Sequence, residues 1–148
     1  MAYSIARSVH IRRKPAEVAA VVTRMEELGK YLVGFSRFES VGSKRNQIGA
    51  EYEVYLDIGT IQVGGRVAIT DLDESGRLGW TSKRGTRHSF ALKTELDGDG
   101  SRITISLSYE LAGRLLARIS ERIGGTILAR NMEASAEKLR HHLEFELD

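Results

Sequence analysis

The chain of 148 residues contains no cysteine, one proline and one tryptophan. Without cysteine there is no disulfide framework, thiolate metal site or cysteine nucleophile, and this composition suits a reducing compartment. No stretch approaches the roughly 20 apolar residues of a membrane span. The first residues, MAYSIARSVHIRRKP, lack the apolar run of a signal peptide. We therefore expect a protein that acts in the cytoplasm.

An excess of charge of one sign is also missing. The formal net charge is +2, and the pI is about 9.0. These values allow weak attraction to anionic surfaces but do not indicate a nucleic-acid-binding protein. A hydrophobic content of 41% and a charged content of 28% are ordinary for a globular protein. The length predicts one domain over residues 1–148.

The N-terminal part of the chain predicts a strand followed by helices. The segment YSIARSVHI alternates with period two, which predicts a half-buried strand whose apolar face is interrupted by Arg7. That face carries Tyr3, Ile5, Val9 and Ile11. Pro15 then opens PAEVAAVVTRMEELGKYL, and proline is tolerated in a first helical turn. We expect this helix to end or break at Gly29 and a short second helix to run to Leu32.

From Phe35 to Ala112 the pattern changes to period two, interrupted by turn segments such as DLDESG and DGDG. Connections of this kind favour antiparallel hairpins, so we predict about six consecutive strands in addition to the first. One face of each strand is apolar and the other polar, which is typical of a sheet covered on one side. For the pair Gly64-Gly65 we favour a bend or bulge over a ligand contact.

The segment from Leu107 to Glu144 begins as a strand and ends as a helix with one strongly apolar side. The apolar stripe is formed by Leu116, Ile119, Ile123 and Ile127 and then by Leu128, Met132, Leu139 and Leu143. Because each glycine costs about 1 kcal/mol in a helix interior, Gly124-Gly125 predicts a kink or break. The long C-terminal helix is expected over Thr126 to Phe145. Its apolar side has one available partner, the apolar face of the sheet.

This order of elements resembles the START-like superfamily with its helix-grip fold. Within it, the chain is similar to the bacterial polyketide cyclase/dehydrase and lipid-transport group. The matching segments are VHIRRKPAEVAAVV, VGSKRNQIGAEYEV, DLDESGRLGWTS and NMEASAEKLRHHLE. The resemblance implies an α+β fold in which a curved, seven-stranded antiparallel sheet wraps around the long C-terminal helix. Two short helices lie between the first and second strands, and residues 1–148 form a single START-like domain.

The resemblance also implies a cavity between the sheet and the C-terminal helix that binds a hydrophobic small molecule. Lipids, sterol-like molecules and aromatic polyketide-like molecules are the expected classes, and the protein would act as a carrier or sensor. We expect no cofactor, metal or nucleic acid, and a monomer or weak dimer. The predicted lining on the shared inner face is Tyr52, Val54, Val67, Trp80, Ser82, His88, Phe90, Ile105, Tyr109, Ile127 and Asn131.

Two other functions remain open. One is a polyketide-type cyclase or dehydratase, for which relatives carry polar and charged groups in the cavity. Here no carboxylate falls on the predicted inner face of the central strands, so His88 with a pocket tyrosine is the one candidate for acid–base catalysis. A lone histidine in an amphipathic strand is also a common structural residue. The other function is a ligand-free interaction module, and Trp80 suits a packed core as well as a cavity wall.

One surface feature suggests a further partner. The segment RLLARISERI places Arg114, Arg118 and Arg122 at four-residue spacing opposite an apolar stripe. A basic amphipathic helix beside a cavity mouth predicts transient contact with an anionic membrane, and a solvated arginine face is the alternative.

Overall fold

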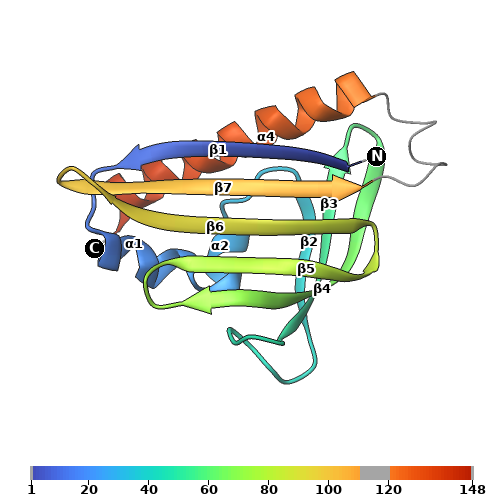
Figure 1. Cartoon of the computed structure of the whole chain (residues 1–148), viewed down its shortest axis with the longest axis horizontal. Coiled ribbons are helices and arrows are strands. Elements are labelled where there is room, and N and C mark those ends of the chain that lie inside the picture. The colour runs from blue at the N-terminus through green and yellow to red at the C-terminus, as the bar shows by residue number, and fades with distance from the viewer. Residues whose placement is uncertain (1, 111–120, 148) are drawn as a thin grey trace.

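The computed structural model describes residues 2–110 and 121–147. A seven-stranded antiparallel sheet has helices against one of its faces, with the order β1-β7-β6-β5-β4-β3-β2 (Figure 1). Its strands are β1 (Ala2–Ile11), β2 (Phe35–Val41), β3 (Glu51–Ile58), β4 (Ile61–Asp73), β5 (Arg77–Gly85), β6 (Arg87–Asp97) and β7 (Gly100–Glu110). The helices are α1 (Pro15–Val22), α2 (Met25–Gly29), α4 (Glu121–His141) and the π-helix η1 (His142–Glu146). The predicted helix-grip architecture is therefore confirmed.

The period-two pattern of the sequence corresponds to the two faces of the sheet. Along β3, the side chains of Tyr52 and Val54 are buried, while Glu51 and Glu53 between them are partly exposed. Leu96 is an exception, because it follows Phe90 and Leu92 of β6 in the same alternation and yet its exposure is 74%. The β6–β7 hairpin, which carries Leu96, extends past the described helices that cover the inner face (Figure 1).

Helix α4 packs mainly along β1, the strand with which the chain begins. Arg7, which interrupts the apolar face of β1, places its Nε atom 3.6 Å from a carboxylate oxygen of Glu133 on α4. Ser135 of α4 accepts a 2.7 Å hydrogen bond from the Val33 backbone N–H through its Oγ atom. Among residues 2–110 and 121–147, no helix has both the length and the hydrophobicity needed to cross a lipid bilayer.

Two predicted helix boundaries were wrong. Helix α4 begins before Thr126 and continues through Gly124-Gly125 without a break, and the helical segment runs on as η1 to Glu146. Gly124 is buried, so packing compensates for the low helix propensity of glycine. Near the N-terminus an additional break falls after Val22, because Arg24 is extended and Met25 starts α2, which ends at Gly29 and does not reach Leu32. The Met25 N–H donates to Asn46 Oδ1 at 2.9 Å, a cap supplied from the β2–β3 loop.

Gly64 and Gly65 lie where β4 passes closely between two other strands. Gly65 is paired with Val54 of β3 on one side and with Gly85 of β5 on the other. Both glycines have positive φ angles, +137° and +149°. A β-carbon at Gly65 would overlap the Arg84 carbonyl oxygen, and one at Gly64 would overlap the Val54 carbonyl oxygen. The pair therefore permits a close backbone approach, and a register shift follows directly, between Arg66 and Val67.

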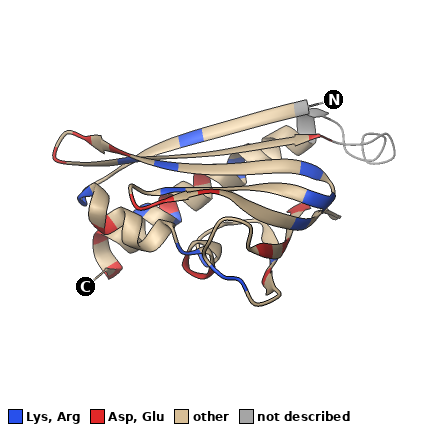
Figure 2. Ribbon diagram, turned by 60° about the horizontal axis from the view of Figure 1, so that its bottom comes forward, with Lys and Arg blue, Asp and Glu red and all other residues tan. Residues whose placement is uncertain are grey.

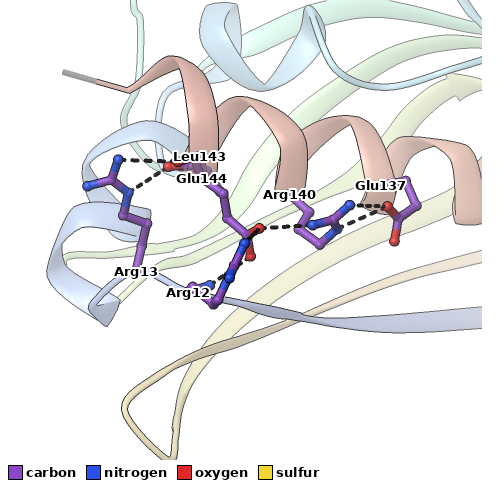
Figure 3. A network of polar contacts seen from close by, with 6 residues as sticks. All are labelled: Arg12, Arg13, Glu137, Arg140, Leu143 and Glu144. Carbon is purple, nitrogen blue, oxygen red and sulfur yellow. Dashed lines mark hydrogen bonds and ion pairs between the residues drawn. The ribbon is translucent and has the colours of Figure 1, made fainter.

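A buried carboxylate holds the C-terminal end of the chain against the end of β1 (Figure 3). The Glu144 side chain is 4% exposed. It accepts hydrogen bonds from the Arg12 backbone N–H at 2.9 Å and from Arg140 Nη1 at 2.9 Å. Arg13 Nε donates to the carbonyl oxygen of Leu143 at 2.8 Å. These contacts lie at the end of the sheet opposite the N-terminal end of α4.

We expect Glu144→Gln to lower the free energy of unfolding at neutral pH by about 1.5–3 kcal/mol, the usual worth of hydrogen bonds to a charged group. Burial alone would raise the pKa of Glu144, but the Arg12 N–H and the charges of Arg12 and Arg140 lower it overall. This stabilisation is therefore present above the ordinary glutamate pKa and is lost as the pH falls through the lowered value.

Denaturant unfolding at neutral and acidic pH measures this difference. Glu146→Gln is the matched control, since Glu146 lies on the same π-helix with a side chain that is 55% exposed. A difference between wild type and Glu144→Gln that persists undiminished in acid would contradict the assigned role of the carboxylate.

Candidate ligand-binding site

A small apolar cavity lies between the inner face of the sheet and helix α4. Its walls come from β3, β4, β6, β7, the β5–β6 turn and α4. The lining residues are Leu56, Ile58, Val63, Thr86, His88, Leu107, Tyr109 and Leu128. The volume open to the centre of a water-sized sphere is about 10 Å³, which is the space of about one water molecule.

His88 is one of the polar residues that line the cavity. Its hydrogen bonds to Trp80 and Thr86 determine which ring nitrogen carries the proton. The Trp80 Nε1–H lies 3.1 Å from His88 Nε2, and indole can only donate. His88 Nε2 must therefore accept, which leaves the proton on Nδ1. Nδ1–H then donates to the carbonyl oxygen of Thr86 at 3.0 Å. Burial lowers the pKa of His88, although the hydrogen bond to Thr86 opposes this shift.

We expect nuclear magnetic resonance to show His88 as neutral imidazole with its proton on Nδ1 at about pH 7. The ring ¹⁵N shifts measure this state directly. Because the folded-state pKa is lowered, the neutral ring stabilises the fold above about pH 6.5, and this contribution is lost as the pH falls. His88→Gln should therefore lose less stability than wild type between about pH 6.5 and pH 5. A cationic or Nε2-protonated His88 at about pH 7 would contradict the assignment.

Trp80 lies behind His88 in a cluster of aromatic rings. It is fully buried and stacks on Phe90 with a centroid separation of 4.2 Å. Phe35 and Phe38 of the edge strand β2 meet the indole edge-on at 6.2 and 5.6 Å. The indole is thus coupled to the cavity through its hydrogen bond to His88.

The sheet is interrupted beside His88. Strands β5 and β6 are paired from Leu78 and Leu92 to Thr81 and Ser89. Beyond that pair the Ser82 hydroxyl accepts the His88 backbone N–H at 3.1 Å, and β5 remains paired with β4 only. An open groove at this end of the sheet is lined by His88 and Tyr109, which also line the inner cavity. The cavity and the groove therefore share two wall residues at this interruption.

The predicted lining residues fall into three groups. His88 and Tyr109 line the small cavity. Ser82, Ile127 and Asn131 are partly buried. Six others are buried in the hydrophobic core: Tyr52, Val54, Val67, Trp80, Phe90 and Ile105. The predicted lining did not include the other six residues of the cavity, although Leu128 belonged to the predicted helix stripe: Leu56, Ile58, Val63, Thr86, Leu107 and Leu128.

The polar groups of the interior are engaged in hydrogen bonds. His88 could act as a general base only by breaking its bond to Trp80. The Tyr52 hydroxyl donates to Glu26 Oε1 at 3.4 Å, and burial raises its pKa. In the part of the chain that the structure describes, no group of three or more His, Asp or Glu side chains is placed to hold a metal ion.

The predicted arginine stripe falls largely beyond the part of the chain that the structure describes. Arg114 and Arg118 lie outside the described residues, and Arg122 is described only as part of the backbone of α4. Membrane contact through these residues therefore stays a prediction.

Comparison with known proteins identifies the family. A family model described as "Polyketide cyclase / dehydrase and lipid transport" matches residues 2–144. The chain belongs to this family. Membership in the polyketide cyclase/dehydrase and lipid-transport family implies the binding of a hydrophobic small molecule, without specifying which. No curated protein matches the chain.

Solved structures of the same fold come from bacteria and plants. TTHA0849 from Thermus thermophilus has a TM-score of 0.79 at 18% identity, covering 95% of this chain and 97% of the other. The ZhuI aromatase/cyclase from Streptomyces sp. R1128 has a TM-score of 0.72 at 11% identity, covering 99% and 98%. The major latex-like protein 151 from Panax ginseng has a TM-score of 0.69 at 9% identity, covering 95% and 97%. At these identities the likeness shows the fold alone.

Proposed function

We propose that this chain is a single START-like domain that binds an apolar small molecule between the inner face of its sheet and helix α4. It would act as a carrier or sensor in the cytoplasm. The observation that carries the proposal is the cavity around His88 and Leu128, whose walls are apolar apart from three neutral polar side chains. The proposed ligand classes remain lipids, sterol-like molecules and aromatic polyketide-like molecules.

Binding requires this cavity to enlarge. Pockets for small molecules usually measure about 300–1,000 Å³, whereas the volume open to the centre of a water-sized sphere here is about 10 Å³. The side chain of Leu128 on α4 would have to move away from β3 and β4. Burial of about ten methylene groups gains about 8 kcal/mol, part of which would be spent on opening the cavity. Moderate affinity is the expected consequence.

The small size of the cavity also supports a second candidate, the ligand-free interaction module. In that case the interior would stay closed and would bind no apolar molecule. The cyclase or dehydratase is the weaker candidate, because the hydrogen bonds of His88 leave neither ring nitrogen ready to accept a proton from a substrate. Loss of turnover of a poly-β-keto substrate in His88→Ala would be needed to support it.

Native mass spectrometry of freshly purified protein separates the first two candidates. Under the main proposal, we expect a population heavier than the bare chain by a reproducible increment that organic extraction removes. Bare chain alone, together with no binding of an apolar probe after extraction, would support the closed interaction module.

A further inference from the structure

We infer that the buried end of the ligand is an uncharged hydrogen-bonding group, such as an amide, ketone or alcohol, and not an ionised carboxylate or phosphate. This inference rests on the proposed function. It follows from the eight cavity-lining residues, which contribute five aliphatic side chains, two hydroxyl groups and one imidazole. None of the eight carries a fixed charge, so a buried anion would have no counter-ion among them.

His88 is held so that it cannot readily become that counter-ion. Protonation would place a second N–H on Nε2, pointing at the Trp80 Nε1–H only 3.1 Å away. Two donors would then face each other. Trp80 cannot turn aside easily, because it is fully buried and stacked on Phe90. The cavity therefore presents a neutral imidazole whose donor is already used by Thr86.

The polar edge of the cavity suits a neutral group instead. Thr86 Oγ1 accepts the Gly64 backbone N–H at 3.2 Å, which leaves the hydroxyl proton of Thr86 to be donated. Tyr109 lies on the same wall of the cavity and brings a neutral phenol instead of a charge. Both are found with His88 at the interruption between β5 and β6. A ligand carbonyl or hydroxyl at this edge could exchange hydrogen bonds without bringing a charge into the interior.

The basic residues of this end of the sheet lie outside the cavity. Lys83, Arg84 and Arg87 are exposed, and Figure 2 shows blue segments at this end. Lys83 Nζ lies 3.3 Å from Glu51, and Arg87 lies 3.7 Å from Glu110. The open groove includes Arg87 and Glu110, whereas the inner cavity does not. Among the residues that the structure describes, a charged ligand group would thus find a partner at this end of the sheet only outside the cavity, in water.

Isothermal titration calorimetry with two isosteric probes tests the inference. The probes are 2-naphthamide, which is neutral, and 2-naphthoate, which is ionised at about pH 8 while His88 is neutral. We expect the wild-type protein to bind the amide roughly tenfold or more tightly than the carboxylate. Equal affinities, or tighter binding of the carboxylate, would overturn the inference and leave the proposed function standing. Failure of both probes to bind would overturn the proposed function as well.

A variant pair tests whether the cavity sets this preference. Val63 lines the cavity from β4 and is 6% exposed. Val63→Lys introduces a cation, and Val63→Met introduces a neutral chain that is also unbranched. We expect the amide-to-carboxylate preference to shrink by roughly tenfold or more in Val63→Lys relative to Val63→Met. If both variants fold and show the same amide-to-carboxylate preference, the probes bind elsewhere. If Val63→Lys does not fold, the comparison of the two probes on the wild-type protein still tests the inference.

Discussion

Gly65→Ala is expected to destabilise the protein by about 3 kcal/mol or more, a large part of the 5–15 kcal/mol by which domains are usually stable. Two effects add at this position. The φ angle of +149° disfavours any residue with a β-carbon. The new methyl group would also overlap the Arg84 carbonyl oxygen, which belongs to a paired strand and cannot rotate away as a side chain would. Denaturant unfolding with a two-state fit measures the change.

Gly42→Ala separates the two effects. Gly42 has a φ of +83°, but nothing lies within 4 Å of the site of its β-carbon. We therefore expect this control to lose only about 1–2 kcal/mol from backbone strain. If Gly42→Ala and Gly65→Ala lower the free energy of unfolding equally, the close approach of the β4 backbone to β5 at Gly65 would be contradicted.

Leu128→Phe is expected to abolish binding of an apolar probe. Leu128 is 2% exposed and forms the α4 wall of the cavity. A phenyl ring at this position would fill the space that the ligand needs, at a stability cost of about 1–3 kcal/mol from overpacking. Leu128→Ala acts in the opposite direction. It should cost about 2–5 kcal/mol, enlarge the cavity and bind the probe more tightly than wild type. Calorimetric titration of 2-naphthamide measures both changes.

Leu139→Phe supplies the matched control for this experiment. Leu139 is fully buried on the same helix but does not line the cavity. We expect Leu139→Phe to lose about as much stability as Leu128→Phe but to bind 2-naphthamide with the affinity of the wild type. If Leu128→Phe and Leu128→Ala both bind the probe as wild type does, the binding site lies elsewhere.

Much of the fold was predictable because it depends on local periodicity. The alternation in EYEVYLDI assigned Tyr52 and Val54 to the inner face, and both are buried. The helical stripe through Leu128 and Leu139 likewise identified the buried side of α4. Each of these patterns depends only on one strand or helix having one face toward the core and the other toward solvent.

The errors and omissions arise where distant segments meet. The break predicted at Gly124-Gly125 ignored the packing that keeps the helix continuous. The role of Glu144 depends on Arg12, 132 positions away in the chain. The tautomer of His88 depends on the hydrogen bond from Trp80, and its surroundings depend on the interruption of the β5–β6 pairing. Hydrophobic periodicity predicts neither feature. The inner face was thus predictable, but the position of the cavity within it was not.

The central claim is that an apolar ligand occupies the space between His88, Tyr109 and Leu128. Intermolecular nuclear Overhauser effects between bound 2-naphthamide and the protein test it most directly. We predict cross-peaks from the naphthalene protons to the Leu128 methyl groups and to the Tyr109 ring, and none to the exposed side chains of Ile48 or Phe145. Cross-peaks confined to exposed side chains, with none to Leu128 or Tyr109, would contradict the claim.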